Sequence, residues 1–235
     1  MTTTLGILGG MGPLATVDFM EKLIRVTPAT CDQDHVPVLV HSVPQVPDRT
    51  EAILAGNDEP LQWMRKGAET LKQAGAGCIA IPCNTAHYWH DALARGLGIP
   101  VLHIVDAAAA ALKAGGIDAG PVGLLATTGT LSANIYQRRF EQLGYTPIST
   151  DPQTQAELVM GGIARIKAGD LDGGRKKLEA AADIVRREDV PAIVLGCTEI
   201  PIVLMGPGYI DATEALARAA FAWYLDASAK ARAAE

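Results

Sequence analysis

Short apolar runs alternate along this chain with longer stretches in which apolar residues recur at helical spacing. The apolar runs have the length and β-branched content of buried strands, and they are Leu5–Leu8, Val36–His41, Gly77–Ile81, Pro100–Ile104, Val122–Ala126 and Ala192–Leu195. The helical stretches are Leu14–Arg25, Pro60–Gln73, Ala86–Arg95, Ala107–Lys113, Leu131–Leu143, Gln155–Ala168, Leu171–Arg187 and Thr213–Ala227. Strands that alternate with helices predict parallel sheets flanked by helices, which is the α/β class.

The second half of the chain repeats the order of the first. Leu5–Gly9 resembles Val122–Ala126, and after a similar distance each is followed by an apolar run that leads to a cysteine, Cys83 or Cys197. After each cysteine come a short apolar segment, an aspartate and an alanine-rich helix. The alternative is that any two strand–helix segments look alike, but the matching cysteines and the similar spacing favour a true repeat.

This repeat predicts how the domains are organised. We expect two similar α/β domains related by a pseudo-twofold axis, with the active site in the cleft between them, because ligands of open α/β sheets bind at the carboxyl ends of the strands. The first domain would comprise residues 1–104 plus 209–235, and the second would comprise residues 105–208.

The two matching cysteines are the first candidates for chemistry. Cys83 lies in Ile79–His87 and Cys197 in Ile193–Pro201, and each stands where a strand ends and a polar, helix-starting stretch begins. A helix N-terminus favours the thiolate form of a nearby cysteine. Two thiols that face each other across a cleft could act as two opposed bases.

The other cysteines and the histidines give no sign of a metal site. Cys78 lies in an apolar strand and Cys31 in an Asp-rich loop, and no pair forms the C-x-x-C spacing of zinc or redox centres. His87 and His90 are three residues apart but lack a third ligand nearby. No ligand spacing is found for the remaining histidines, His35, His41 and His103. We expect no bound metal.

The glycine-rich loop Gly9–Pro13 follows the first strand and precedes a helix, a place where backbone amides can bind an anion. Residues 10–15 also fit the dinucleotide pattern G-x-G-x-x-A, but the second strand ends at His41–Ser42 without the acidic residue of that fingerprint. We therefore expect the loop to bind a carboxylate rather than a nucleotide, and a tight turn with no ligand is the alternative.

Short polar residues follow three of the strands. Asn84 and Thr85 come after Cys83, Thr198 comes after Cys197, and Thr127–Thr130 follows Val122–Ala126. At a helix start such residues can bind a substrate carboxylate, and they can equally serve as ordinary helix caps. Two cations are candidates for the same task, Arg49 beyond a proline-rich loop and Lys167 at a helix end, although either could be an ordinary surface charge.

Composition excludes several classes of function. The chain has 235 residues, of which 49% are hydrophobic and 20% charged, with a formal net charge of −6 and no Lys/Arg cluster. Nucleic acids and anionic membranes are therefore poor candidates for partners. Met1–Thr4 lacks the basic region of a signal peptide, and no apolar run approaches the length of a membrane span. We expect a cytoplasmic protein with reduced cysteines.

Four segments together resemble the aspartate/glutamate racemase superfamily, and in particular its cofactor-independent aspartate racemase branch. They occur in the family's order along nearly the whole chain, and they are Gly6–Pro13, Pro47–Thr50, Pro82–His87 and Gly196–Pro201. Glu199 favours the aspartate branch, since glutamate racemases usually carry histidine at that position, and Pro47–Thr50 supports the same branch.

The resemblance implies an active site between two α/β domains, commonly in a homodimer, and racemisation of a dicarboxylic amino acid without pyridoxal phosphate or metal. It carries over Cys83 and Cys197 as the acid/base thiols, Arg49 as the partner of the side-chain carboxylate and Lys167 as a second cationic contact. Asn84, Thr85, Thr128, Thr130 and Thr198 would surround the amino-acid head group, with Met11 and Glu199 also at the substrate site.

Inversion at Cα suits such a pair of thiols. One thiolate removes a proton from one face, and one thiol returns a proton to the opposite face of a planar carbanion. We therefore expect an aspartate racemase that works by a two-base mechanism. Relatives with broad, glutamate or hydantoin specificity, or maleate isomerase activity, are alternatives, and Arg49 favours an acidic side chain among them. A non-catalytic binding protein and an inactive regulatory homologue are alternatives of another class.

Overall fold

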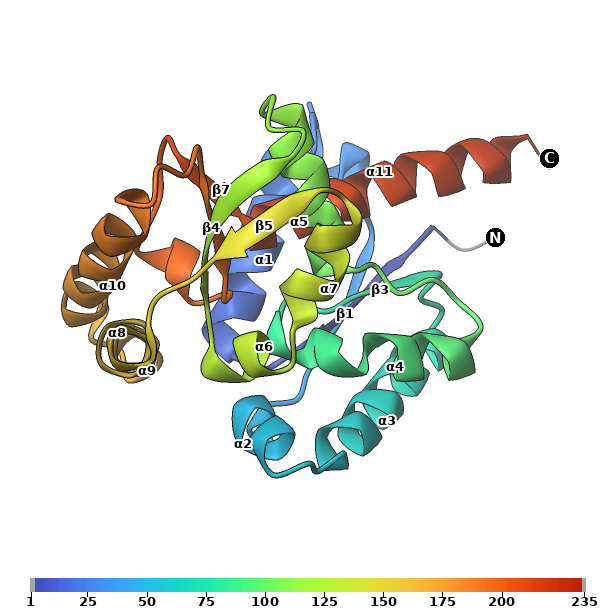
Figure 1. Cartoon of the computed structure of the whole chain (residues 1–235). Coiled ribbons are helices and arrows are strands. Elements are labelled where there is room, and N and C mark those ends of the chain that lie inside the picture. Colours follow the sequence, from blue (N-terminus) through green and yellow to red (C-terminus); the bar gives the residue numbers. More distant parts are fainter. Residues whose placement is uncertain (1–2, 234–235) are drawn as a thin grey trace.

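The protein contains two parallel sheets flanked by helices, as seen in a computed structural model that describes residues 3–233 (Figure 1). The first sheet has the strand order β2-β1-β3, with β1 (Leu5–Gly9), β2 (Val38–Ser42) and β3 (Cys78–Ala80). The second has the order β5-β4-β6-β7, with β4 (Gly120–Ala126), β5 (Tyr145–Ile148), β6 (Ile193–Gly196) and β7 (Tyr209–Asp211). The predicted α/β class is confirmed.

The two sheets repeat the same topology. In each, the strand that comes first along the chain is central, with the second strand on one side and the third on the other. All pairings are parallel, for example Ile7 beside Ala80 in the first sheet and Leu125 beside Leu195 in the second. Parallel strands place their carboxyl ends at one edge of the sheet. The loop after β3 therefore lies at the carboxyl edge of the first sheet, and the loop after β6 lies at the carboxyl edge of the second.

The predicted strand Pro100–Ile104 is wrong. Only a single bridge forms there, between Ile79 and Val101, at the place that β7 occupies in the second sheet. The helix α5 (Ile104–Ala114) begins at the end of this segment, because the His103 side chain caps it by accepting a hydrogen bond from the Val105 N–H. The strand β5 was not predicted.

Most of the predicted helices are present, several with different limits. The α-helices are α1 (Pro13–Val26), α2 (Arg49–Leu54), α3 (Glu59–Gln73), α4 (His90–Leu97), α5, α6 (Thr128–Ser132), α7 (Ile135–Gln142), α8 (Pro152–Thr154), α9 (Gly161–Lys167), α10 (Leu171–Arg186) and α11 (Ala212–Arg232). Three predicted helices are interrupted. Ala86–Arg95 begins as a 3₁₀ helix, Thr85–Trp89, before α4, and Gln155–Ala168 begins as a π-helical turn, Gln155–Met160, before α9. Leu131–Leu143 is divided between α6 and α7 at Asn134, whose φ is 52°. The helices α2 and α8 were not predicted.

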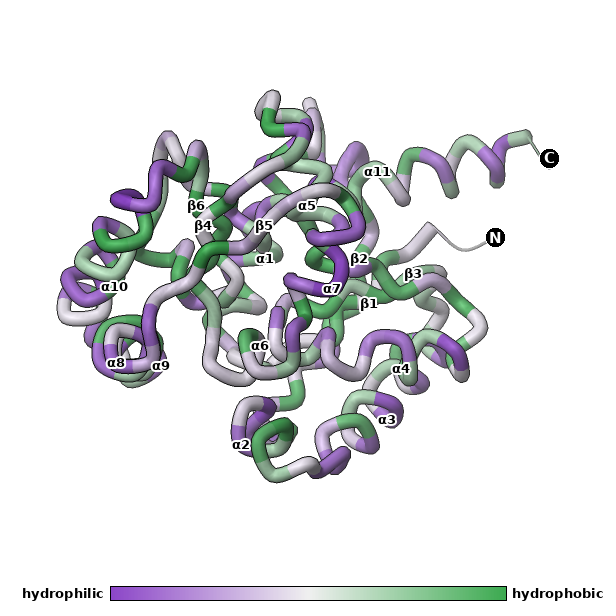
Figure 2. Tube along the Cα trace, in the orientation of Figure 1, coloured by the Kyte–Doolittle hydropathy of each residue, from purple (hydrophilic) through white to green (hydrophobic). Residues whose placement is uncertain are grey.

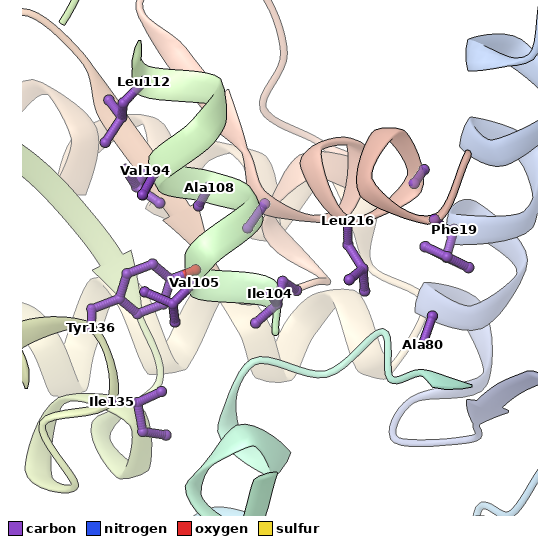
Figure 3. Close-up of a cluster of buried hydrophobic side chains, with 14 of the residues drawn as sticks. Phe19, Ala80, Ile104, Val105, Ala108, Leu112, Ile135, Tyr136, Val194 and Leu216 are labelled. Atoms are coloured by element: carbon purple, nitrogen blue, oxygen red, sulfur yellow. The ribbon is translucent and has the colours of Figure 1, made fainter. Parts of the chain in front are cut away.

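The first half of the chain, up to α5, and the second half, from β4 to α11, share one apolar core. It includes side chains from β1, β4 and β6 and from α5 and α11, and several of them are drawn in Figure 3. The helix α5 packs on α7 and β7 of the second half, whereas α11 packs on α1 of the first half and on α5. Along α3, α10 and α11, hydrophilic residues alternate with hydrophobic ones, as expected for helices that cover a core on one side (Figure 2).

The predicted domain limits can be compared with these contacts. The segment 209–235, assigned to the first domain, contains α11, which lies on α1, but also β7, which pairs with β6 in the second sheet. Residues 1, 2, 234 and 235, at the predicted outer limits, lie outside the described part of the chain. The division into residues 1–104 plus 209–235 and residues 105–208 stays a prediction. Among residues 3–233 no helix is long and apolar enough to cross a bilayer.

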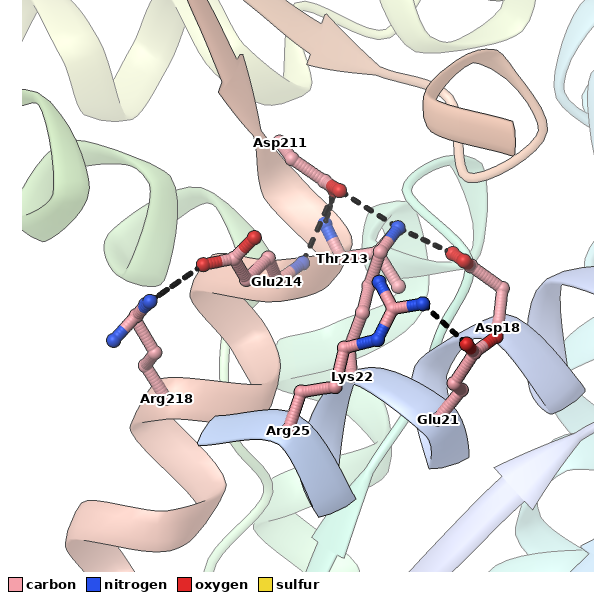
Figure 4. A network of polar contacts seen from close by, with 8 residues as sticks. All are labelled: Asp18, Glu21, Lys22, Arg25, Asp211, Thr213, Glu214 and Arg218. Atoms are coloured by element: carbon pink, nitrogen blue, oxygen red, sulfur yellow. Dashed lines mark hydrogen bonds and ion pairs between the residues drawn. The ribbon is translucent and has the colours of Figure 1, made fainter. Parts of the chain in front are cut away.

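A buried lysine links the two halves at the start of α11 (Figure 4). Lys22 on α1 contacts Asp18 at 2.5 Å and Asp211, the N-cap of α11, at 2.6 Å, and its side chain is only 9% exposed. Burial raises the pKa of Asp18 even with Lys22 beside it. Removal of the ammonium would leave two half-buried carboxyl groups without a counter-charge.

We therefore expect Lys22→Met to lower the free energy of unfolding by about 3 kcal/mol, the cost typical of breaking a buried ion pair by removing one partner. Urea unfolding followed by circular dichroism measures the change. Arg25→Met is the matched control, because Arg25 pairs with Glu21 on the exposed side of the same helix. This substitution should lower the free energy of unfolding by less than about 1 kcal/mol. Equal effects of the two substitutions would contradict the role given to Lys22.

Candidate active site

A small cavity lies where the loops after the strands of the two halves meet. Its accessible volume is about 20 Å³, which is room for about one water molecule. Nine residues predicted for the site line it, namely Met11, Arg49, Asn84, Thr85, Lys167, Thr198, Glu199 and the two cysteines, Cys83 and Cys197. The structure therefore brings both thiols to one cavity, although they are far apart in sequence.

The lining also includes Asp48 and Thr50, which were not predicted. They neighbour Arg49 in sequence, so position alone could have indicated them. Of the polar run Thr127–Thr130, a candidate for carboxylate binding, Thr127 lines the cavity, whereas Thr128 and Thr130 are not among the lining residues.

Cys197 has a carboxylate as its direct partner. Its Sγ–H donates to Oε2 of Glu199 at 3.1 Å, and both residues are buried. Burial raises the pKa of the Cys197 thiol well above its usual value, and the negative charge of Glu199 adds to this, while Lys167 acts weakly in the opposite direction. The expectation that a helix start favours the thiolate is thus wrong for Cys197. It is a thiol whose proton already points at an acceptor.

Cys83 sits in a different environment, although it occupies the equivalent place in the first half. The residue two positions after it is Thr85, whose hydroxyl lies 2.9 Å from that of Thr127 and 3.1 Å from that of Thr130. These two threonines belong to the second half, so the hydroxyl cluster joins the halves beside the thiol. Thr130 is fully buried within this cluster.

The His87 ring is hydrogen-bonded to the backbone of the Cys83 loop. Its Nδ1 lies 2.8 Å from the carbonyl of Cys83, and its Nε2 accepts from the Ile104 N–H at 3.2 Å. Burial, together with the neighbouring His90, lowers the pKa of His87 to about 4. A neutral ring then donates through Nδ1–H and accepts through Nε2, which fixes its tautomer.

Arg49 is anchored by backbone carbonyls and still has donors to spare. Its Nη1 donates to Val46 and Pro47 and its Nη2 to Met11, at 3.0 to 3.2 Å. A guanidinium has five N–H donors, so these bonds use three of them. The Arg49 Nε is buried without a partner among the described residues, and a second Nη2 hydrogen is also free.

Asn84, another residue of the cavity lining, shows the same pattern. Its Oδ1 accepts a hydrogen bond of 2.6 Å from the Tyr136 hydroxyl, while its Nδ2 is buried with no partner among residues 3–233. Buried polar groups without partners are rare and costly in folded proteins. The site thus contains two unpaired buried donors, one on Arg49 and one on Asn84.

The glycine loop and the helix α2 both contribute residues to the cavity lining. The Gly10 N–H donates to the Thr16 hydroxyl at 2.9 Å, so this amide does not bind an anion as expected. Met11 is the loop residue that lines the cavity. The helices α2 and α6 pack directly on each other, since a Cβ on Gly129 would lie 2.8 Å from the Thr50 backbone.

Lys167 reaches the cavity from the end of α9. A π-helical turn, Gln155–Met160, precedes that helix, and such turns occur frequently at functional sites. The Gln155 side chain spans from the Ala126 carbonyl to the Thr150 hydroxyl, which ties the turn to the end of β4.

Metal binding has no visible basis in the described part of the chain. Among residues 3–233 no group of three or more His, Cys, Asp or Glu side chains is arranged to bind an ion. The rings of His90 and His103 pack against the ring of His87. Both ring nitrogens of His90 lie within hydrogen-bond distance of other groups, the Asp91 carboxylate and the Val101 carbonyl. What the cavity offers is acid/base chemistry by thiols, with neutral and cationic N–H donors around them.

Comparison with known proteins places this site in context. The sequence model of the Asp/Glu/hydantoin racemase family matches residues 8–220. The broad-specificity amino-acid racemase RacX of Bacillus subtilis is 30% identical over 231 residues, covering 94% of this chain and 98% of that protein. The structure of Picrophilus torridus aspartate racemase superposes with a TM-score of 0.84 at 33% identity, covering 94% of each chain. A glutamate racemase of Francisella tularensis, at 15% identity and a TM-score of 0.69, shares the fold over 96% of this chain and 82% of its own.

The contact between Cys197 and Glu199 leads to a prediction for thiol reactivity. Glu199→Gln removes a charge that raises the pKa of Cys197, so at any pH below that pKa the thiolate fraction should rise, by about tenfold for each unit of pKa. The alkylation rate with iodoacetamide, measured against pH in a Cys31→Ser/Cys83→Ala background, reports on Cys197, because burial raises the pKa of Cys78 to about 12.

Glu188→Gln, at an exposed position, is the control and should leave the rate unchanged. Slower alkylation in Glu199→Gln would show instead that the carboxylate acts mainly as the acceptor of the thiol proton, and the predicted sign would be refuted.

Proposed function

The chain belongs to the Asp/Glu/hydantoin racemase family, and from its site we propose that it interconverts the L and D forms of an acidic amino acid, with aspartate as the preferred substrate. It is an amino-acid racemase by family, and the identity of the substrate is the part that we infer. We also propose that the reaction needs no pyridoxal phosphate and no metal.

One observation carries the choice of substrate class. Two residues of the lining, Arg49 and Asn84, each have a buried donor without a partner among residues 3–233, namely Arg49 Nε and Asn84 Nδ2, and these donors suit two carboxylate groups. Arg49 has free N–H groups with which a side-chain carboxylate can form charge-assisted hydrogen bonds, and Asn84 can donate to the α-carboxylate. A neutral amino acid would pair one of these donors and leave the other buried without a partner.

Cys83 and Cys197 are proposed as the two bases. When one thiolate removes the Cα proton it becomes a thiol, and the opposite thiol gives its proton to the other face of the carbanion and becomes a thiolate. Protons and charge therefore balance, and reversing the direction exchanges the two roles. Glu199 can take the proton of Cys197 when that residue must act as the base, since its carboxylate already accepts the Sγ–H.

Charge that develops in the carbanion spreads into the α-carboxylate. Amide and hydroxyl donors that surround a closed cavity stabilise such charge more than water does. Asn84, Thr85 and Thr198 are proposed for this role, and Lys167 adds a cation at the edge of the site. Thr128 and Thr130, which do not line the cavity, make no contact with the substrate.

Substrate entry requires movement. The cavity has room for about one water molecule, and an amino acid is several times larger. The helices α2 and α6 come from opposite halves and pack on each other beside the cavity, since α2 carries Arg49 and Thr50 and α6 follows Thr127. We propose that these helices separate to admit the substrate and return over it.

A broader substrate range is the second candidate, because RacX, which is similar over nearly its whole length, is a broad-specificity racemase. A homodimer and a cytoplasmic location remain predictions from the sequence; sedimentation velocity would test the first.

The proposed activity is tested by proton NMR of L-aspartate, and then of D-aspartate, in deuterated water without added cofactor. We expect the Cα–H signal to disappear while chiral chromatography detects the opposite enantiomer, because the proton returned to Cα comes from solvent-exchanged thiols. Cys83→Ala and Cys197→Ala should each abolish racemisation. Cys31→Ser, which changes an exposed cysteine, is the control and should keep full activity.

Exchange with glutamate or with neutral amino acids but not with aspartate would refute the substrate and leave the two-thiol mechanism intact. Absence of exchange with any amino acid would refute the proposed activity.

The role proposed for Arg49 gives a further prediction. Arg49→Lys keeps the charge but loses the planar set of donors, so we expect kcat/KM for aspartate to fall by about 10- to 100-fold, mostly through KM, because the side-chain carboxylate is bound similarly throughout the reaction. Steady-state kinetics by polarimetry measure the change. Arg65→Lys, at an exposed position, should have no effect, and an equal loss with alanine as substrate would contradict a role in binding the side-chain carboxylate.

A further inference from the structure

Tyr136 is a fully buried residue in the first turn of α7, and the predicted site does not include it. Its ring lies in the shared apolar core (Figure 3) and packs edge-on against Phe140, with ring centroids 5.1 Å apart. Its hydroxyl is the polar end of an otherwise apolar environment, and it donates to the Asn84 Oδ1 at 2.6 Å. A tyrosine thus extends from the core of the second half to a cavity residue of the first half.

The ring also touches the other cysteine loop. A Cβ on Gly196, the residue before Cys197, would lie 3.1 Å from Cε2 of Tyr136. The absence of a side chain at Gly196 therefore lets the ring lie against the backbone that leads to Cys197. Through one side chain, the segment before Cys197 is in contact with the residue after Cys83.

The hydroxyl determines which way the Asn84 amide faces. Burial raises the pKa of Tyr136, and the nearby Cys197 and Asp211 raise it further, so the group stays protonated. In the described part of the chain its proton has one acceptor, the Asn84 Oδ1. A flipped amide would leave that proton without an acceptor, which is costly in a buried place. With Oδ1 bound, Nδ2 is the atom left for the cavity.

We propose that Tyr136 is a positioning residue for the racemisation reaction, which orients the Asn84 amide so that its Nδ2 donates to the α-carboxylate of the substrate. The inference rests on the proposed function and extends it to a residue that does not touch the substrate. Without the tyrosine hydroxyl, the Asn84 amide is free to turn its oxygen toward the carboxylate, where it repels rather than binds.

A double-mutant cycle tests this proposal. The variants are Tyr136→Phe, Asn84→Ala and both together, with kcat/KM for racemisation as the readout. We expect Tyr136→Phe to lower kcat/KM by about tenfold, the effect of losing one well-placed hydrogen bond, and to lower it less than about twofold in the Asn84→Ala background. A purely structural role of the hydroxyl would give the same loss in both backgrounds and would overturn the proposal.

Tyr145→Phe is the matched control. Tyr145 belongs to the same aromatic stack through Phe140, and its hydroxyl likewise donates to an acceptor, the Ile117 carbonyl at 2.7 Å, which lies outside the cavity lining. We expect this variant to keep wild-type kcat/KM, and melting temperatures of all variants show that they fold. A loss in Tyr145→Phe equal to that in Tyr136→Phe would count against positioning.

A binding measurement separates this inference from the proposed activity. The same cycle is measured on the dissociation constant of succinate, which carries two carboxylates and cannot be racemised, by isothermal titration calorimetry. If Tyr136→Phe weakens succinate binding about tenfold and non-additively with Asn84→Ala, while the wild type racemises no amino acid, the positioning of Asn84 is supported and the proposed activity is refuted. Racemisation by the wild type with additive effects in both cycles would refute the inference alone.

Discussion

The geometry of the site depends on the apolar core that joins the two halves. The helices that end the two halves, α5 and α11, pack against each other, and each also covers elements of the opposite half. One continuous set of buried side chains therefore anchors β1, β4 and β6 together. Because the cysteine loops leave strands that are fixed in this core, both thiols reach one cavity. Separation of the halves as independent bodies would expose this apolar surface to water, which is unfavourable.

Within this repeated scaffold the two thiols are not equivalent. The residue two positions after the cysteine is Thr85 in the first half and Glu199 in the second. Glu199 gives Cys197 a direct carboxylate partner, whereas Thr85 joins a hydroxyl cluster with Thr127 and Thr130. A protein that must act on both faces of one carbon needs two groups that start in different protonation states. The difference between these two residues can supply that inequality without any change in the fold.

The sequence allowed much of this arrangement to be predicted, because buried strands and covering helices have distinct apolar periods and because parallel strands end at a common edge. Residues next to the cysteines in sequence could thus be placed at the site. The short strand Tyr145–Ile148 was not predicted, because only its first residue is buried and its apolar pattern is therefore weak. The raised pKa of Cys197 and the contact between Tyr136 and Asn84 depend on burial depth and on packing between halves, which no local pattern encodes.

Unpaired donors are the basis of the selectivity that we propose for this cavity. Arg49 is fixed by the carbonyls of Val46, Pro47 and Met11 before any ligand arrives, and the Asn84 amide is oriented by the core. Each buried donor without a partner costs about 1–3 kcal/mol, and a ligand with an acceptor at the right place relieves that cost. A ligand with two carboxylates relieves it twice, whereas one that lacks the second leaves an N–H of Arg49 buried and unpaired. Discrimination of this kind is stronger than a difference in pocket size can give, because the penalty falls on the wrong ligand.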